Sequence, residues 1–367
     1  DYHAALVRSG FDPGSLDIGY EHGKLNSTFI DNRFTIGQSF QFPTVYRNQK
    51  KLANANWEIS KMSSGVLTLE LQTGIKQVFY AMLVMEKRKE ALQQADSIYA
   101  GFAARSENRL KQGETDALEL ATAQNLRLEI TSQLKMLTRD QAVFQRRLQY
   151  LTGSATPWQP DAGSLLYTPQ GGILTADSVN ENNPLLQMRS AMIAQSDASL
   201  KLEKSKLLPS IGIGYANASF SGYQTLADGS EKYFGRSDRF QSLMLSVGIP
   251  LFRSAQHARI DASRILIRQQ QTEKQAEQAA LNTALDNAQK AYAFDLGLMQ
   301  TYQKSLLPNS DIILQTAGNR LKSGDISYLE WVMLINQAIE TKSKYYSIIE
   351  QLNESAIGIE KIAGTIY

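Results

Sequence analysis

Apolar and polar positions follow two different periods along this chain. Two long stretches, from about residue 45 to 151 and from about residue 256 to 362, carry apolar residues every three or four positions among Glu, Gln, Arg and Lys. This spacing predicts very long amphipathic helices with a coiled-coil-like surface. Both stretches are rich in Ala, Gln and Ser, which suits a wall of helices that is wet on one side. An ordinary soluble helical bundle fits the same pattern equally well.

Four short segments alternate apolar with polar or small residues at period two, which predicts strands with two different faces. They cover residues of about 15–22, 33–42, 210–219 and 240–250. Pro43 and Pro250 close the second strand of each pair, where a strand gives way to a helix N-terminus. A soluble hairpin packed on the helices is the other structure that this alternation allows.

The chain repeats itself in the order of its landmarks. Arg109-Leu110-Lys111-Gln112-Gly113 reappears as Arg320-Leu321-Lys322-Ser323-Gly324, and Leu151-Thr152-Gly153 corresponds to Ile362-Ala363-Gly364. We therefore expect two structural repeats, 1–183 and 184–367. The first would hold helices of about 45–112 and 114–152 with a connector over 154–183, and the second helices of about 184–206, 256–323 and 325–363.

Strands of about 10 residues are long enough to cross a bilayer when tilted, whereas the sequence holds no run of about 20 apolar residues that would form a membrane helix. Four strands do not close a barrel, and an open edge in lipid leaves backbone groups unpaired at several kcal/mol each. Closure therefore requires other copies, and a channel favours three chains because the interior of an eight-stranded barrel is filled by side chains. Aromatic residues near the strand ends are candidates for an interfacial girdle: Tyr20, Phe34, Phe42, Tyr215, Phe240 and Phe252.

Composition argues against catalysis. Lys and Arg number 38 against 36 for Asp and Glu, so no charge excess points to nucleic acid. The chain has no cysteine, and its three histidines lie far apart in sequence. It also lacks a phosphate loop, a Gly-x-Gly-x-x-Gly turn and a His-Glu-x-x-His motif. We therefore expect no enzyme, no cofactor and no metal site, and the N-terminal residues show no signal peptide.

The doubled order of hairpin, proline, long helix, Arg-Leu-Lys-x-Gly, shorter helix and small-Gly terminus resembles the TolC-like outer membrane factors. More narrowly, residues 31–46 and the segments 206–209 and 248–252 resemble the TolC-like portion of Bacteroidota heavy-metal resistance-nodulation-division efflux systems, which is often fused to the pump. The resemblance spans essentially the whole chain.

This resemblance implies a mainly α fold with a β-barrel contribution. Three chains would form a twelve-stranded outer-membrane barrel and a helical tunnel in the periplasm. It further implies a passive exit duct for heavy-metal cations, served by a periplasmic adaptor (membrane fusion protein) and a resistance-nodulation-division pump. A soluble periplasmic adaptor or coiled-coil scaffold is the alternative, because such proteins also use long antiparallel helices.

The resemblance also assigns roles to residues. The two glycine turns are expected at the periplasmic tips, where adaptors dock: Arg109, Leu110, Lys111, Gly113, Arg320, Leu321, Lys322 and Gly324. Glu119 and Glu330, six positions after the tip glycines, correspond to acidic gate residues; a solvated helical glutamate is the equally weighted alternative. The connector corresponds to an equatorial belt. Family members begin with a full helix before the first strand, so we expect about 20 further residues of helix ahead of Asp1.

Overall fold

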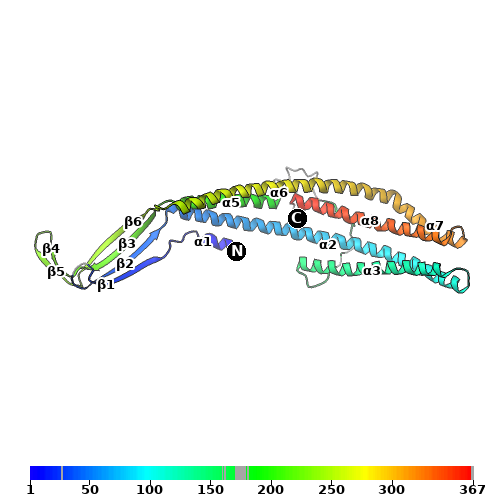
Figure 1. The fold of residues 1–367 in the computed structure, drawn as a ribbon, viewed down its shortest axis with the longest axis horizontal. Coiled ribbons are helices and arrows are strands. Elements are labelled where there is room, and N and C mark those ends of the chain that lie inside the picture. Colours follow the sequence, from blue (N-terminus) through cyan, green and yellow to red (C-terminus); the bar gives the residue numbers. More distant parts are fainter. Residues whose placement is uncertain (26–27, 159, 161–162, 170–178, 180–181, 365–367) are drawn as a thin grey trace. The chain divides into compact units, whose positions relative to one another are not determined.

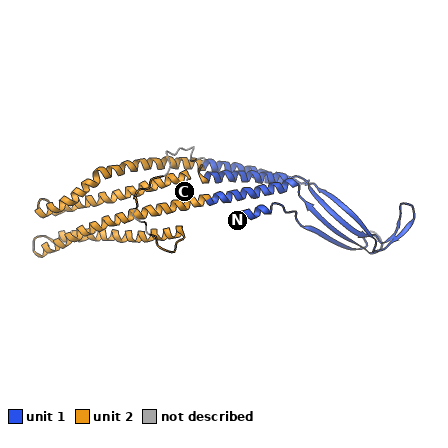
Figure 2. Ribbon diagram, turned by 180° about the vertical axis from the view of Figure 1, so that it is seen from behind, with its two compact units in different colours: residues 1–64, 185–276 blue, residues 65–184, 277–367 orange. Residues whose placement is uncertain are grey.

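The computed structural model describes residues 1–25, 28–158, 160, 163–169, 179 and 182–364. The chain is mainly helical, with one four-stranded sheet and one two-stranded hairpin (Figure 1). This is the fold class that the sequence predicts. It forms two compact units, residues 1–64 with 185–276 and residues 65–184 with 277–367 (Figure 2). Each unit combines segments from both halves of the sequence.

The first unit contains both sets of strands. Its sheet is antiparallel in the order β1-β2-β3-β6, and β4 and β5 form a separate hairpin. Helix α1 precedes β1, and helix α5 precedes β3. The bounds are α1 Tyr2–Arg8, β1 Leu16–Gly23, β2 Asp31–Phe40, α5 Pro184–Ser205, β3 Ser210–Ser219, β4 Gly222–Thr225, β5 Glu231–Phe234 and β6 Arg239–Gly248.

The strand register gives the sheet two distinct faces, because directly paired residues of an antiparallel ladder point to the same side. One face is apolar over most of its length: Leu16, Ile18, Tyr20, Phe34, Ile36, Phe40, Ile211, Ile213, Tyr215, Leu243, Leu245 and Val247. Gln38, paired with Leu16 and Ile213, is polar, and the end of this face away from the helices also carries polar residues: His22, Asn32, Asn217 and Gln241. We call it the apolar face.

The other face, which we call the small-residue face, is built largely from Gly, Ala, Ser and Thr. Gly19 pairs with Thr35, Gly212 with Ser246, and Gly248 with Ser210. A Cβ on Gly19 would lie 2.6 Å from the Thr35 Oγ1 atom, so any larger residue there would displace the Thr35 hydroxyl group.

Both outer strands of the sheet have a free edge. Within the described residues, β1 pairs only with β2 and β6 pairs only with β3. Every residue of β6 is exposed, including Leu243 at 84% and Leu245 at 80%. An apolar edge strand of this kind is unstable in water without a covering partner.

Long helices make up the rest of the chain. They are α2 Pro43–Lys111, α3 Ala117–Thr152, α6 Ser254–Thr301, a π-helical turn Tyr302–Leu306, α7 Leu307–Ser323 and α8 Tyr328–Ala363. The π-helical turn ends just before Pro308, which has no backbone N–H to donate to the preceding turn. Helices α2 and α6 begin in the first unit and continue into the second.

The main core of the second unit includes an aromatic stack that joins α2 to α8. The Phe102 ring lies 4.4 Å from that of Tyr328 at an interplanar angle of 4°, and 4.7 Å from that of Trp331 at 26°. Phe102 and Trp331 are each 2% exposed. The two helical hairpins of this unit are therefore packed against each other near their turns.

Part of the expected belt, residues 154–183, lies outside the described residues. Where it is described, it is fastened to the helices by a buried polar contact. Lys76 Nζ lies 2.7 Å from Glu360 Oε1 and 3.0 Å from the hydroxyl of Tyr167, which also hydrogen-bonds to Glu360. Glu360 is 4% exposed and therefore has little contact with water. The Lys76 ammonium group and the Tyr167 hydroxyl compensate its buried charge.

Candidate functional site: the two helical turns and the two-faced sheet

The two expected tips are helical turns of the same geometry. Gly113 and Gly324 have φ values of +76° and +78°. In each turn, the residue after the glycine donates its backbone N–H to the carbonyl of the motif arginine, Arg109 or Arg320, at 2.9 and 3.0 Å. This hydrogen bond closes a helix end whose left-handed residue favours glycine.

The basic residues of both turns are exposed, and Arg109 also forms ion pairs with Glu119 at 3.2 Å and Glu114 at 3.8 Å. Lys111 lies 2.8 Å from Glu107, and its hydrogen bond to that carboxylate lowers the Glu107 pKa. Within the described part of the chain, Arg320 and Lys322 form no ion pair with an acidic side chain. Leu110 and Leu321 are half-buried. Each turn therefore offers exposed positive charge over a partly buried leucine.

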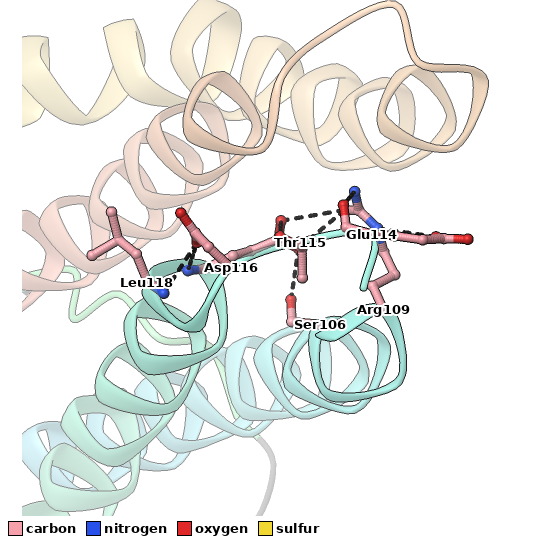
Figure 3. A network of polar contacts seen from close by, with 7 residues as sticks. Ser106, Arg109, Glu114, Thr115, Asp116 and Leu118 are labelled. Carbon is pink, nitrogen blue, oxygen red and sulfur yellow. Dashed lines mark hydrogen bonds and ion pairs between the residues drawn. The ribbon is translucent and has the colours of Figure 1, made fainter. Parts of the chain in front are cut away.

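Glu119 is held inside the first turn. It is 8% exposed, and its carboxylate accepts hydrogen bonds from Ser106 Oγ at 2.9 Å, Arg109 Nη1 at 3.2 Å and Thr115 Oγ1 at 2.6 Å (Figure 3). Asp116 caps α3 by accepting from the backbone N–H of Glu119 at 3.1 Å. The glutamate thus connects the end of α2 to the start of α3.

Glu330, at the matching position of the second turn, makes different contacts. Its carboxylate accepts from the Ser327 backbone N–H at 2.7 Å, and its own N–H donates to Ser327 Oγ at 3.3 Å, which forms a capping box. The backbone and hydroxyl hydrogen bonds of Ser327 lower the Glu330 pKa. Ala317 and Ile326 occupy the positions of Ser106 and Thr115, so the second turn lacks the hydroxyl groups that surround Glu119.

The charge of Glu119 also acts on the aromatic stack. Burial, together with that nearby carboxylate, raises the pKa of Tyr328 to about 12. The sequence interpretation missed Ser106, Thr115 and the stack of Phe102 with Tyr328 and Trp331. An alignment of the two repeats could have pointed to these two hydroxyl groups, because Ser106 and Thr115 align with Ala317 and Ile326, which have none.

The register separates the six expected girdle residues. Tyr20, Phe34 and Tyr215 lie on the apolar face. Phe240 pairs with Ala218, and through it with Arg33 and Glu21, so it lies on the small-residue face. The expectation for Phe240 is therefore corrected: it does not share a surface with the other strand aromatics, because it is one residue out of phase with them.

Phe42 and Phe252 lie just outside the strands, at the end of the sheet next to the helices. Phe42 is half-buried, and Phe252 is 97% exposed.

The described residues contain no group of three or more His, Cys, Asp or Glu side chains placed to hold a metal ion. In the same part of the chain, no helix combines the length and the apolar character needed to span a membrane.

Comparisons with known proteins give one matching family model and several structures of the same fold. Residues 175–365 match the model of the outer membrane efflux protein family. A comparison with curated protein sequences gave no match. The fold is similar to that of CusC, from a study of its folding and transmembrane channel formation, with a TM-score of 0.79 at 16% identity, covering 99% of this chain and 86% of that one.

Two further structures have the same fold. The Campylobacter jejuni CmeC outer membrane channel superposes with a TM-score of 0.80 at 12% identity, covering 99% of this chain and 80% of CmeC. The outer membrane protein VceC from Vibrio cholerae gives 0.78 at 10% identity, covering 99% and 90%.

Proposed function

Because this chain belongs to the outer membrane efflux protein family, we propose that it is one protomer of a trimeric exit duct in a tripartite efflux system. The family consists of channels and not of enzymes. The observation that carries the proposal is the sheet: four strands with one apolar face, one small-residue face and two free edges.

The free edges support closure by other copies. Successive strands are antiparallel, so β6 runs opposite to β1. Joining β6 of one copy to β1 of the next therefore continues the antiparallel order around a ring. Three copies give a twelve-stranded barrel, wide enough for a channel, and every backbone group finds a partner.

The two faces then acquire separate environments. Lipid covers the apolar face, and the small-residue face lines the channel. Tyr20 and Phe34, which pair directly, lie toward the end of the sheet away from the helices, and Phe42 and Phe252 lie at the other end. We assign these residues, with Tyr215, to the membrane girdle, which puts the sheet in the outer membrane and the helices in the periplasm.

The helical turns are the proposed docking sites for a periplasmic adaptor. Their matched geometry and exposed Arg and Lys side chains support this role for Arg109, Leu110, Lys111 and Gly113 and for their counterparts Arg320, Leu321, Lys322 and Gly324. Glu119 and Glu330 are proposed gate residues. Their different contacts mean that the two glutamates contribute differently, since only Glu330 is exposed.

The proposed cargo is a heavy-metal cation, supplied by a resistance-nodulation-division pump that is either a separate protein or on the same polypeptide. This assignment rests on the resemblance of residues 31–46, 206–209 and 248–252 to heavy-metal systems. A passive duct contacts its cargo weakly, so its walls need no dedicated metal ligands.

The test combines assembly with export. The purified chain should require detergent and give threefold-symmetric particles of three copies by native mass spectrometry and negative-stain microscopy. Deleting its gene in the host should raise sensitivity to heavy-metal salts, and a plasmid copy should restore tolerance. A chain that stays monomeric and monodisperse without detergent would instead be a soluble scaffold. If the deletion raises sensitivity to organic toxins alone, the cargo is an organic molecule and the assignment as an exit duct still holds.

A further inference from the structure

The β4–β5 hairpin has no role in the duct as described so far. It connects β3 to β6 and lies beyond the end of the sheet opposite the helices (Figure 1). Its register pairs Tyr223 with Tyr233 and Gly222 with Phe234. In an antiparallel hairpin these neighbouring pairs point to opposite sides, so the hairpin has a tyrosine side and a Phe234 side.

The Phe234 side is attached to the sheet through an aromatic cluster. The Phe240 ring lies 5.3 Å from that of Phe234 and 5.0 Å from that of Phe220, both in edge-to-face geometry. Phe240 lies on the small-residue face. The cluster therefore sits on the side of the sheet that lines the channel in the proposed duct.

The base of the hairpin is fixed by a buried carboxylate. Asp31, 1% exposed at the start of β2, accepts hydrogen bonds from the Ser221 backbone N–H at 2.8 Å and from Ser219 Oγ at 3.0 Å. Gly222 has a φ of +132°, and a Cβ there would lie 3.5 Å from the Phe29 ring. These contacts hold the hairpin in one orientation at the rim of the sheet.

The cluster is also bulkier than the next part of the same face. Moving toward the helices, the next row of paired residues is Gly19, Thr35, Ala216 and Ser242. These side chains are small. The row of Phe240 also holds Glu21, Arg33 and Ala218, and Arg33 lies 3.2 Å from Glu21. Its long side chains extend further from the wall than those of the Gly19 row.

We propose that Phe220, Phe234 and Phe240 of three copies form an aromatic collar at the outer mouth of the channel, which selects solutes by size. The collar, with the Arg33–Glu21 ion pair in the same row, narrows the mouth, so that it admits small hydrated ions and excludes bulky hydrophilic molecules from outside. The proposal rests on the trimeric duct of the proposed function.

Thiol accessibility tests the collar without depending on the periplasmic gate. The chain has no cysteine, so Ser242→Cys places a single reporter on the small-residue face just inside the collar. Cells carrying this variant are treated from outside with a small charged maleimide and with a polyethylene-glycol maleimide. We expect the small reagent to label Cys-substituted chains readily and the large reagent to label them at least tenfold more slowly.

Removing the aromatic rings should open the path. In the Phe234→Ser/Phe240→Ser background, the large reagent should label at least tenfold faster, while the small reagent keeps its rate. Tyr223→Ser/Tyr233→Ser is the matched control, since it removes two aromatic rings from the other side of the same hairpin, and it should leave both rates unchanged. Phe234→Leu keeps an apolar side chain and serves as a milder variant if the double substitution does not yield trimers.

The outcomes separate the two proposals. Equal labelling of the Ser242→Cys chain by both reagents, or faster labelling by the large reagent in the tyrosine variant, would overturn the collar. The duct itself is tested by Leu245→Cys on the apolar face. If this position is labelled from water and Ser242→Cys is not, the faces are reversed and the channel assignment fails.

Discussion

At the scale of single residues, the two tip glutamates show that a repeated sequence does not guarantee a repeated contact. Glu119 and Glu330 follow their glycines at the same spacing. Two hydroxyl groups and an arginine surround the first, whereas the second caps its own helix. The first carboxylate therefore ties two helices together, and the second stabilises only the start of α8.

Glu119→Gln should loosen the first turn. The substitution removes the charge that Arg109 faces at 3.2 Å and weakens the hydrogen bonds from Ser106 and Thr115. Arg109 is partly exposed, so we expect the free energy of local opening to fall by about 1–2 kcal/mol. Amide hydrogen exchange of residues 106–119 in the purified assembly measures this change.

Glu330→Gln is the matched control for that substitution. It should speed exchange only in the first turn of α8 and leave residues 106–119 protected. Equal loosening of both turns by both substitutions would show that the contacts of Glu119 add nothing beyond a helix cap.

At the scale of elements, periodicity is informative where one face of an element differs from the other. The alternation of Ile18, Ile36, Ile213 and Leu245 predicts a two-faced sheet, and the register places these residues on one face. The β4–β5 hairpin could not be predicted this way, because each of its strands has four residues and little alternation. The error at Phe240 has the same origin: composition near a strand end does not reveal phase, which only pairing fixes.

The contacts of the candidate site are harder still to predict. Ser106 and Glu119 meet across a turn, and Phe102 meets Trp331 across a much larger sequence separation. The glycine motif locates both turns, since a left-handed helix end restricts the residue type. The partners of each side chain depend on how the helices pack, which local sequence does not specify.

Charge reversal at both turns should separate docking from assembly. Lys111→Glu combined with Lys322→Glu replaces two exposed cations on the helical turns, which are not part of the sheet. We expect the affinity for the immobilised periplasmic adaptor to fall by about tenfold, because interfacial charges steer and orient partners. The oligomeric state should not change. A pull-down with quantified binding, alongside native mass spectrometry, measures both properties.

Lys344→Glu is the control for the turns. Lys344 pairs with Glu340 one helical turn away, much as Lys111 pairs with Glu107, but it lies in the body of α8. Reversing it should leave adaptor binding intact. The docking assignment is wrong if the double variant binds the adaptor like the parent.

At the scale of the whole molecule, the free edges of β1 and β6 are where copies meet in the proposed barrel. A continuous apolar face in that barrel requires the apolar residues of β1 and β6 to stay on the same side across the junction between copies. In β1 these are Leu16, Ile18 and Tyr20, and in β6 they include Leu245. Asp17 and Gly19 point to the other side.

This restriction predicts a pattern of cross-links that a different assembly would not give. Leu245→Cys is combined in turn with a cysteine at each position from 16 to 20, in a chain without other thiols. Disulfides need Cα atoms roughly 4.4–6.8 Å apart on the same face. Oxidation should therefore link chains at one or two of positions 16, 18 and 20, and at neither 17 nor 19.

Because each chain carries both edges, a closed ring of three gives covalent dimers and trimers and no larger species on a non-reducing gel. A ladder beyond the trimer would show an open array, and cross-linking at position 17 or 19 would show that the apolar face is not continuous across the junction between copies.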